Sequence, residues 1–167
     1  KTGQLAAGLA GGGDGQKACP ADVVLSPMPI GELVAALQGI AVPDSVQTAA
    51  AGLPYRDFVT VGLLVRRLRP KNETTMRAPG TLIPDCWIYV QDRCVKLGRV
   101  QISNNWSPYM VKAPLDTVFV GLEYFCRAGD DYWYSDVITL SALGRYALLK
   151  IGLLVEQYAI LDHYLLK

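Results

Sequence analysis

The sequence is poor in the residues that build metal sites and in the long apolar runs that cross membranes. It contains one histidine, His163, and four cysteines, no two of which are spaced as Cys-x-x-Cys. Zinc sites draw their ligands from such closely spaced pairs, so we predict no metal site. No apolar run reaches the roughly 18 residues that a membrane-spanning helix needs, so we predict no membrane span.

The arrangement of the cysteines also bears on the compartment. Their spacing does not resemble the disulfide framework of a secreted domain, and no signal peptide is evident. We therefore expect reduced thiols and a cytoplasmic protein. The chain begins with Lys1 rather than methionine and stops at Lys167 within a strand-like segment, so we expect a piece of a longer protein.

The net charge of the chain is small, and the sequence contains few candidate catalytic groups. A net charge of +1 over 167 residues gives no reason to expect nucleic acid or an anionic membrane as a partner. A basic cluster over residues 66–71 follows a strand-like run, and we interpret it as a solvated strand end. No Ser/His/Asp triad is evident. Asp130 and Asp131 are adjacent and point in different directions, which makes them a poor acid–base pair.

Glycines crowd the first 20 residues and give a formal match to a dinucleotide-binding fingerprint. The match, G-x-G-x-x-A, falls on Gly13, Gly15 and Ala18. The fingerprint needs a strand before it and a helix after it, so that phosphate lies at the helix N-terminus. Pro20 follows here, and no strand-like run precedes the glycines. We predict a Gly-rich hairpin or loop over residues 1–20 instead.

The remaining residues form strand-like and helix-like runs that predict an α+β fold. We expect a mixed, mainly antiparallel sheet with helices packed on one face. The apolar run Val61–Val65 indicates a strand that is buried on both faces. Residues 69–84 and 127–133 are expected to be loops. Strands are predicted at Ala21–Leu25, Tyr55–Arg67, Asp85–Gln91, Val95–Ile102, Thr117–Tyr124 and Asp162–Leu166, and helices at Ile30–Leu37, Asp44–Ala51 and from the Ser135-Asp136 cap to Gly152.

A polar and aromatic turn, Ser103–Tyr109, follows the strand that ends at Ile102. Asparagine tolerates left-handed backbone and proline cannot donate to a ladder, so the strand is expected to stop there. Several side-chain amides, a tryptophan and a tyrosine would gather at one strand end. Two interpretations stay open: a rim that faces a ligand, and a well-packed hairpin loop.

Five segments of the chain form a recognisable set: ADVVLSPMPIGELV, LPYRDFVTVGLLVRRL, IPDCWIYVQD, GRVQISNNWSPYMV and VFVGLEYFCRAGDDYW. Together they resemble FAD-dependent amine oxidoreductases, among them protoporphyrinogen-oxidase-like and UDP-galactopyranose-mutase-like proteins. The resemblance covers about residues 20–167, and LPYRDFVTVGLLV and NNWSPYMV are its distinctive parts.

The resemblance implies a division of the chain and a cofactor. Residues 21–52 would be an edge of a Rossmann-type FAD-binding domain, and residues 53–167 would be the substrate-binding domain. The intact parent would bind FAD, whereas this piece would bind none and would be inactive alone. Ser26, Pro27 and Met28 would lie beside the flavin, although an ordinary strand-to-helix turn explains them equally well.

The resemblance also implies a substrate surface for a small molecule, such as a sugar nucleotide or a polycyclic or amine compound. Aromatic rings would stack on the substrate and amides would orient its polar groups. Trp87 and Tyr89 lie on one strand, and we expect one of them to face a cavity and the other to pack. The matching residues are Tyr89, Asn104, Asn105, Trp106 and Tyr109.

A second hypothesis comes from a different class of protein. The chain would be a non-catalytic α+β module whose rim at Asn104–Tyr109 holds a ligand by stacking and by amide hydrogen bonds. The residues alone do not decide between this module and a piece of a flavoenzyme.

Overall fold

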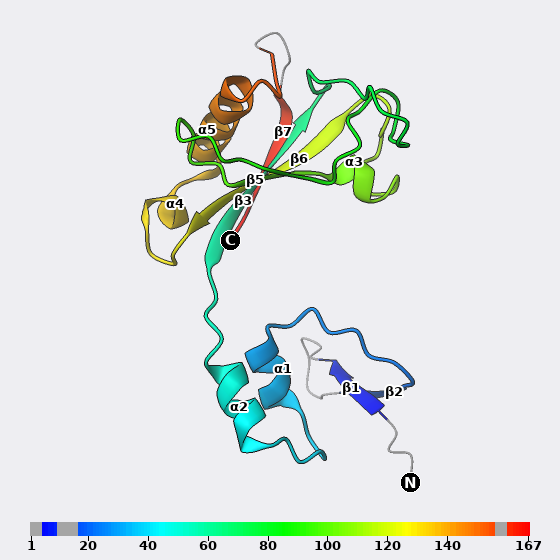
Figure 1. The fold of residues 1–167 in the computed structure, drawn as a ribbon, viewed down its shortest axis with the longest axis vertical. Coiled ribbons are helices and arrows are strands. Elements are labelled where there is room, and N and C mark those ends of the chain that lie inside the picture. Colours follow the sequence, from blue (N-terminus) through cyan, green and yellow to red (C-terminus); the bar gives the residue numbers. More distant parts are fainter. Residues whose placement is uncertain (1–4, 10–16, 156–159) are drawn as a thin grey trace. The chain divides into compact units, whose positions relative to one another are not determined.

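The computed structural model describes residues 5–9, 17–155 and 160–167. The chain divides into two compact units, residues 1–55 and residues 56–167. Figure 1 shows the elements of both units along the chain. None of the helices in the described ranges is long and apolar enough to span a membrane.

The first unit contains a hairpin and two short helices. Strands β1 (Leu5–Leu9) and β2 (Lys17–Ala21) pair antiparallel, in agreement with the predicted hairpin. The predicted turn between them, residues 10–16, lies outside the described residues. Helices α1 (Ile30–Ala36) and α2 (Asp44–Ala51) contact each other and begin close to the predicted positions.

The predicted strand over Ala21–Leu25 is wrong. Strand β2 ends at Ala21, and residues 23–27 have no regular secondary structure. Val23 is 74% exposed and Leu25 is 91% exposed. A strand depends on backbone hydrogen bonds to a neighbouring strand, and none of the described strands pairs with this segment.

The described part of the first unit has almost no hydrophobic core. Ala50 is the one buried apolar residue among its described side chains. Burial of apolar surface is the main favourable term in folding, so this unit has little to stabilise it by itself. Its exposed large apolar residues are Val23, Val24, Leu25, Met28, Ile30, Leu37, Ile40, Val46, Leu53 and Tyr55.

The second unit is built on a five-stranded sheet with the order β4-β5-β6-β3-β7. Every neighbouring pair in this sheet is antiparallel. The sheet confirms the predicted α+β fold with a mainly antiparallel sheet. The strands are β3 (Asp57–Val65), β4 (Trp87–Tyr89), β5 (Arg99–Ile102), β6 (Val118–Cys126) and β7 (Ile160–Leu166).

One face of this sheet forms the core. Val59, Val61, Leu63 and Val65 of β3 are completely buried, and β6 pairs with them in a register that places Leu122 opposite Val61. Alternate residues of a strand share a face, so this register aligns the apolar side chains of neighbouring strands. On the opposite face, Gly62 is buried, Leu64 is half-buried and Phe58 is exposed. The predicted burial of Val61–Val65 on both faces is therefore confirmed except at Leu64.

The predicted long helix is α5 (Val137–Lys150), and it packs on the buried face of the sheet (Figure 1). Its first turn is capped by Asp136, whose carboxylate accepts a hydrogen bond of 2.8 Å from the backbone N–H of Thr139. Gly144 is required where the helix meets the sheet, because a Cβ there would lie 2.5 Å from Cδ1 of Leu122. Gly152, with φ of +77°, follows the end of the helix.

Two segments that we predicted as irregular contain single helical turns. Ser103–Trp106 forms α3 within the predicted turn, and Asp131–Tyr134 forms α4 at the end of the predicted loop 127–133. Asp130 caps α4 by accepting a hydrogen bond from the backbone N–H of Trp133. Such short helices depend on local side-chain caps and tertiary contacts rather than on apolar periodicity, so periodicity does not reveal them.

Candidate functional site

The face of the sheet opposite the core, here called the open face, carries a buried ion pair at its centre. Glu123 of β6 has no exposed surface, although it points away from the hydrophobic core. Its carboxylate accepts a hydrogen bond of 2.7 Å from Nε of Arg99, and Nη2 of Arg99 lies 2.6 Å from Oε2. Gln101 donates to the other carboxylate oxygen. Both carboxylate oxygens of Glu123 therefore accept hydrogen bonds from side chains of the neighbouring strand β5.

Aromatic rings surround the guanidinium of Arg99. Its Cζ lies 4.6 Å from the centre of the Trp87 ring and 5.6 Å from the centre of the Tyr89 ring, within the range of cation–π attraction. Nη1 donates to the Tyr89 hydroxyl at 3.4 Å. Trp106 of α3 meets Trp87 edge-on, with ring centres 5.0 Å apart. Predicted residues Tyr89 and Trp106 thus belong to one cluster.

The expectation that only one of Trp87 and Tyr89 faces a possible site is wrong. Residues two apart on a strand share a face, and both rings lie over Arg99. Each remains substantially exposed, as does Trp106. The three rings therefore offer flat surfaces at the edge of the open face, beside the fixed charge of Arg99.

The cluster is suited to recognition rather than to proton transfer. The hydrogen bonds with Glu123 and Tyr89 raise the pKa of Arg99 above its ordinary value, so the guanidinium stays charged. A guanidinium has five N–H donors, and Glu123 and Tyr89 do not use all of them. A polar ligand group could accept a hydrogen bond from Arg99 while its apolar part stacks on Trp87 or Tyr89.

Glycines and aromatic residues form the rest of the open face. The ring of Phe119 lies across Gly62, where an added Cβ would come within 2.5 Å of the ring. The ring of Phe125 lies across Gly98 in the same way. Tyr164 of β7 meets Phe119 edge-on at 6.0 Å. These rings cover backbone that has no side chain of its own, and they give the face a largely aromatic surface.

Asn104 and Asn105 serve the loop rather than the open face. Asn104 is only 2% exposed, and its amide nitrogen donates to the carbonyl oxygens of Pro114 and Thr117. Its amide oxygen accepts from the backbone N–H of Phe119. The nitrogen of Asn105 donates to the carbonyl oxygens of Ile83 and Asp85. Both groups of the Asn104 amide are thus bound to backbone, which corrects the expectation that Asn104 orients a substrate. The oxygen of Asn105 has no hydrogen-bond partner among the described residues, so its predicted role stays a prediction.

The remaining predicted residues are Tyr109 and the turn at Ser26, Pro27 and Met28. Tyr109 is 95% exposed, and no ring contact is seen for it in the described part of the chain. Ser26, Pro27 and Met28 are exposed in the irregular segment between β2 and α1, where the Ser26 hydroxyl accepts from the backbone N–H of Met28 at 3.3 Å. They belong to the first unit, whereas the Arg99 cluster belongs to the second, so their predicted place beside a flavin stays a prediction.

The described residues of the first unit do not fit the FAD pyrophosphate. Such a group needs a strand, a tight Gly-rich turn and a helix N-terminus in succession. Here β2 is followed by an irregular segment, and α1 has only seven residues.

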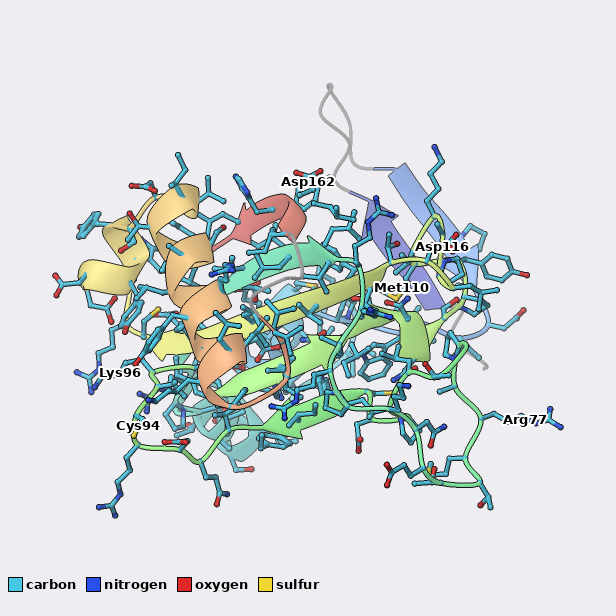
Figure 2. All side chains as sticks on the ribbon, turned by 90° about the horizontal axis from the view of Figure 1, so that it is seen from above. Arg77, Cys94, Lys96, Met110, Asp116 and Asp162 are labelled. Atoms are coloured by element: carbon cyan, nitrogen blue, oxygen red, sulfur yellow. The ribbon has the colours of Figure 1, made fainter. Side chains whose placement is uncertain are left out.

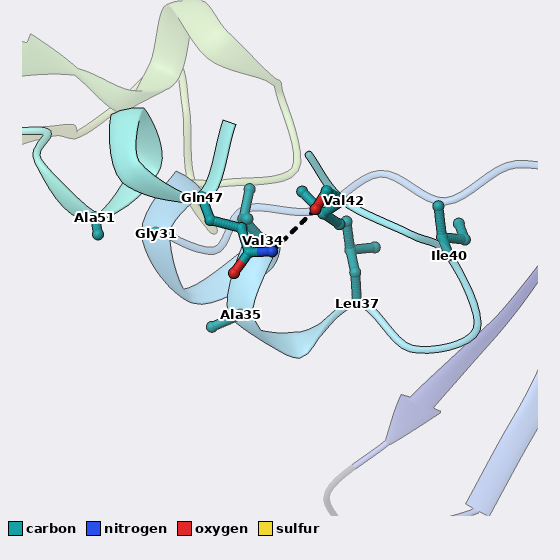
Figure 3. Close-up of a pocket in the computed structure, with 8 residues that line it drawn as sticks. All are labelled: Gly31, Val34, Ala35, Leu37, Ile40, Val42, Gln47 and Ala51. Carbon is teal, nitrogen blue, oxygen red and sulfur yellow. Dashed lines mark hydrogen bonds between the residues drawn. The ribbon is translucent and has the colours of Figure 1, made fainter. Parts of the chain in front are cut away.

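The first unit holds a pocket of about 350 Å³ lined mainly by aliphatic side chains and without an ionisable group (Figure 3). In it, Gln47 donates to the carbonyl oxygen of Val42 at 2.9 Å.

Metal binding has no support among the described residues. They contain no group of three or more histidine, cysteine, aspartate or glutamate side chains that could hold an ion.

The basic cluster at residues 66–71 is exposed at its four cationic positions, as expected for a solvated strand end.

The main residues that the sequence prediction missed are Arg99, Gln101 and Glu123. A usable signal was present, because Glu123 is a single acid within the apolar run VFVGLEYF. An acid inside a buried strand needs a partner. The sequence did not say which of the chain's many cations supplies it.

The comparisons with known proteins bear on the fold. No protein-family model matches the chain, and no curated protein matches it either. A search of solved structures matches it to the crystal structure of reduced UDP-galactopyranose mutase, with 20% sequence identity and a TM-score of 0.50. The chain has the fold of part of UDP-galactopyranose mutase. The match covers 91% of this chain and 30% of that mutase chain.

This match agrees with the predicted resemblance at the level of fold. Identity of 20% shows the fold alone, so the activity and the cofactor of UDP-galactopyranose mutase do not transfer with it. The chain spans less than a third of the length of the mutase chain.

Proposed function

We propose that this chain is the substrate-binding region of a flavoprotein related to UDP-galactopyranose mutase, with an edge of its FAD-binding domain. One observation carries the proposal: the open face of a mutase-like sheet holds a fixed Arg99–Glu123 pair beneath exposed aromatic rings. Surfaces that bind sugars and other ring compounds combine flat apolar faces with a few fixed polar groups.

The first unit supports the same proposal. Its large apolar side chains are exposed, and Ala50 alone is buried among its described apolar residues. In an FAD-binding domain, further strands and helices on both faces of a sheet would cover such residues. FAD would supply redox chemistry at its isoalloxazine ring, and the residues of this chain would bind and orient the substrate.

We expect the isolated chain to bind no stoichiometric FAD. The described residues lack the turn and helix N-terminus that hold a flavin pyrophosphate. Purified chain would be mixed with FAD, passed through a desalting column and examined by visible absorption. A retained flavin band near one equivalent would contradict this expectation and would show that the chain forms a flavin site by itself.

We expect Trp106→Ala in the complete parent protein to weaken substrate binding by about 1–3 kcal/mol while leaving the flavin content unchanged. Trp106 is exposed at the open face and contacts Trp87, so its loss removes a stacking surface without opening the core. Activity, flavin stoichiometry and melting temperature would be measured on one preparation.

Tyr109→Ala is the matched control for that variant, because Tyr109 is an aromatic residue of the same loop that lies in solvent. We expect it to leave substrate binding unchanged. If Trp106→Ala lowers the melting temperature and the flavin content but leaves the activity per folded molecule intact, Trp106 is a packing residue and the assignment fails.

A non-catalytic ligand-binding module is the second candidate. It is favoured by the position of the Arg99 cluster, which lies wholly within a sheet unit that has its own core. The coding sequence upstream of Lys1 distinguishes the two candidates. A strand followed by a Gly-rich turn and a helix there supports the flavoprotein, and an unrelated domain supports the module.

A further inference from the structure

The basic segment 66–71 lines a cavity at the end of β3 and the start of β6. The cavity has a volume of about 110 Å³, and residues 79–82, 114–115 and 118 form the rest of its wall. No aspartate or glutamate is found among the described residues that line it. We call this cavity the basic pocket. Its cationic residues are Arg66, Arg67, Arg69 and Lys71.

Three of these cations have no partner within the described part of the chain. Arg66, Arg69 and Lys71 are exposed, and their side chains form no hydrogen bond or ion pair with another described residue. Positive charges that lie close together repel one another, and in most proteins a neighbouring acid offsets this repulsion. In the basic pocket, whose described lining contains no acid, a bound anion would offset it.

A tight turn in the wall of the basic pocket supplies further donors. The backbone N–H of Leu82 donates to the carbonyl oxygen of Pro79 at 3.1 Å, which closes a turn over residues 79–82. Gly80 has φ of +57° in this turn, a conformation that glycine adopts readily. The backbone N–H groups of Gly80 and Thr81 have no hydrogen-bond partner among the described residues, and the Thr81 hydroxyl can also donate.

Backbone contacts hold this turn beside the basic segment. Lys71 and Leu82 form an antiparallel bridge. The backbone N–H of Asn72 donates to the carbonyl oxygen of Thr81 at 2.9 Å. Neutral donors and cations from two parts of the loop are therefore brought to one cavity.

Such a set of donors is typical of phosphate binding. Guanidinium and ammonium groups, backbone N–H groups and hydroxyls all bind phosphate oxygens. A water molecule takes up about 30 Å³ of liquid, so the pocket has the volume of about three or four water molecules. This space suits one phosphoryl group rather than a length of nucleic acid.

We propose that the basic pocket binds the phosphoryl group of a small phosphorylated compound through Arg66, Lys71 and the donors of the turn at residues 79–82. The proposal does not depend on the proposed function, since none of the residues that line the basic pocket belongs to the Arg99 cluster.

The test is a titration of the complete 167-residue chain with inorganic phosphate at constant ionic strength, followed by backbone amide NMR. We expect saturable shifts at residues 66, 71 and 80–82, with a dissociation constant of about 1 mM. In the double variant Arg66→Gln/Lys71→Gln, the affinity should fall by about tenfold or more, because two charged donors are lost. Thr81→Val, which removes one neutral donor, should lower it by about threefold.

Arg77→Gln is the matched control. Arg77 belongs to the same loop, is exposed, does not line the basic pocket and projects away from the loop (Figure 2). This variant should keep the affinity for phosphate within about twofold, and acetate should bind the original chain about tenfold more weakly than phosphate does. The proposal is overturned if phosphate gives no saturable shifts or if the double variant binds phosphate as well as the original chain does. It is also overturned if Arg77→Gln weakens binding as much as the double variant, or if acetate binds as tightly as phosphate.

A lipid headgroup is another source of phosphate, because Leu115 is 76% exposed at the rim of the basic pocket. Cosedimentation with vesicles of phosphatidylcholine and phosphatidylglycerol distinguishes the two sources. We expect no vesicle binding, since stable attachment to a membrane takes more than one weak signal. Vesicle binding that inorganic phosphate does not displace would overturn the proposal of a small phosphorylated compound.

Discussion

Replacing Arg99 with methionine is expected to lower the free energy of unfolding of the chain by roughly 3 kcal/mol. Methionine keeps most of the length and apolar surface of arginine but removes the charge, which leaves the Glu123 carboxylate with Gln101 as its remaining side-chain partner. Glu123 has no exposed surface, so its charge would stay buried and only partly compensated. This value lies at the lower end of the range for breaking a buried ion pair. Arg99 is partly exposed, so water can enter the space that its guanidinium leaves.

Urea unfolding measures this effect, and two other variants identify its cause. Arg93→Met makes the same chemical change at an exposed arginine and should change stability by less than about 0.5 kcal/mol. The double variant Arg99→Met/Glu123→Met should recover most of the loss, because replacing both partners with apolar groups leaves no buried charge. If the double variant is as unstable as Arg99→Met, packing and not charge explains the effect.

Separating the two units is expected to give one stable protein and one unstable peptide. Residues 56–167 contain the sheet, α5 and nearly all the buried apolar residues, so we expect them to unfold cooperatively with the urea midpoint of the complete chain. Residues 1–55 bury only Ala50 among their described apolar side chains, so we expect no cooperative transition. Circular dichroism at increasing urea concentration would be recorded on both pieces and on the complete chain.

Two outcomes would contradict this second prediction. A cooperative transition in residues 1–55 would mean that the unit has a core that the described residues do not reveal. Loss of folded signal from residues 56–167 would mean that the sheet depends on the first unit. Either result would also weaken the proposal that the first unit is an edge of a larger domain.

The long elements could be predicted because their sequences carry a strong local pattern. Strand β3 and helix α5 are nine and 14 residues long, and each has apolar residues at a regular spacing. The segment Val23–Leu25 is equally apolar but forms no strand, because a strand also needs a neighbour and the pattern says nothing of neighbours.

Only some residues of the candidate site could be predicted from the sequence. The predicted rim contained Trp106, and Tyr89 was predicted from the neighbouring strand; the structure brings both into one cluster with Trp87 and Arg99, and their role in binding stays a prediction. The prediction misassigned Asn104, whose amide binds three backbone groups that lie 10 to 15 residues further along the chain. An amide at a strand end suits either a ligand or a loop, and only the path of the loop decides between them.

The sequence by itself determined the α+β class, the long elements and the absence of a metal-binding pattern, because these depend on composition and on spacing along one segment. The tertiary structure alone decided that Arg99 neutralises Glu123 on the open face and that Gln101 binds the other carboxylate oxygen. Both contacts depend on which residues of β5 and β6 lie opposite one another. That register is fixed by the simultaneous burial of the apolar face of every strand, which no single segment contains.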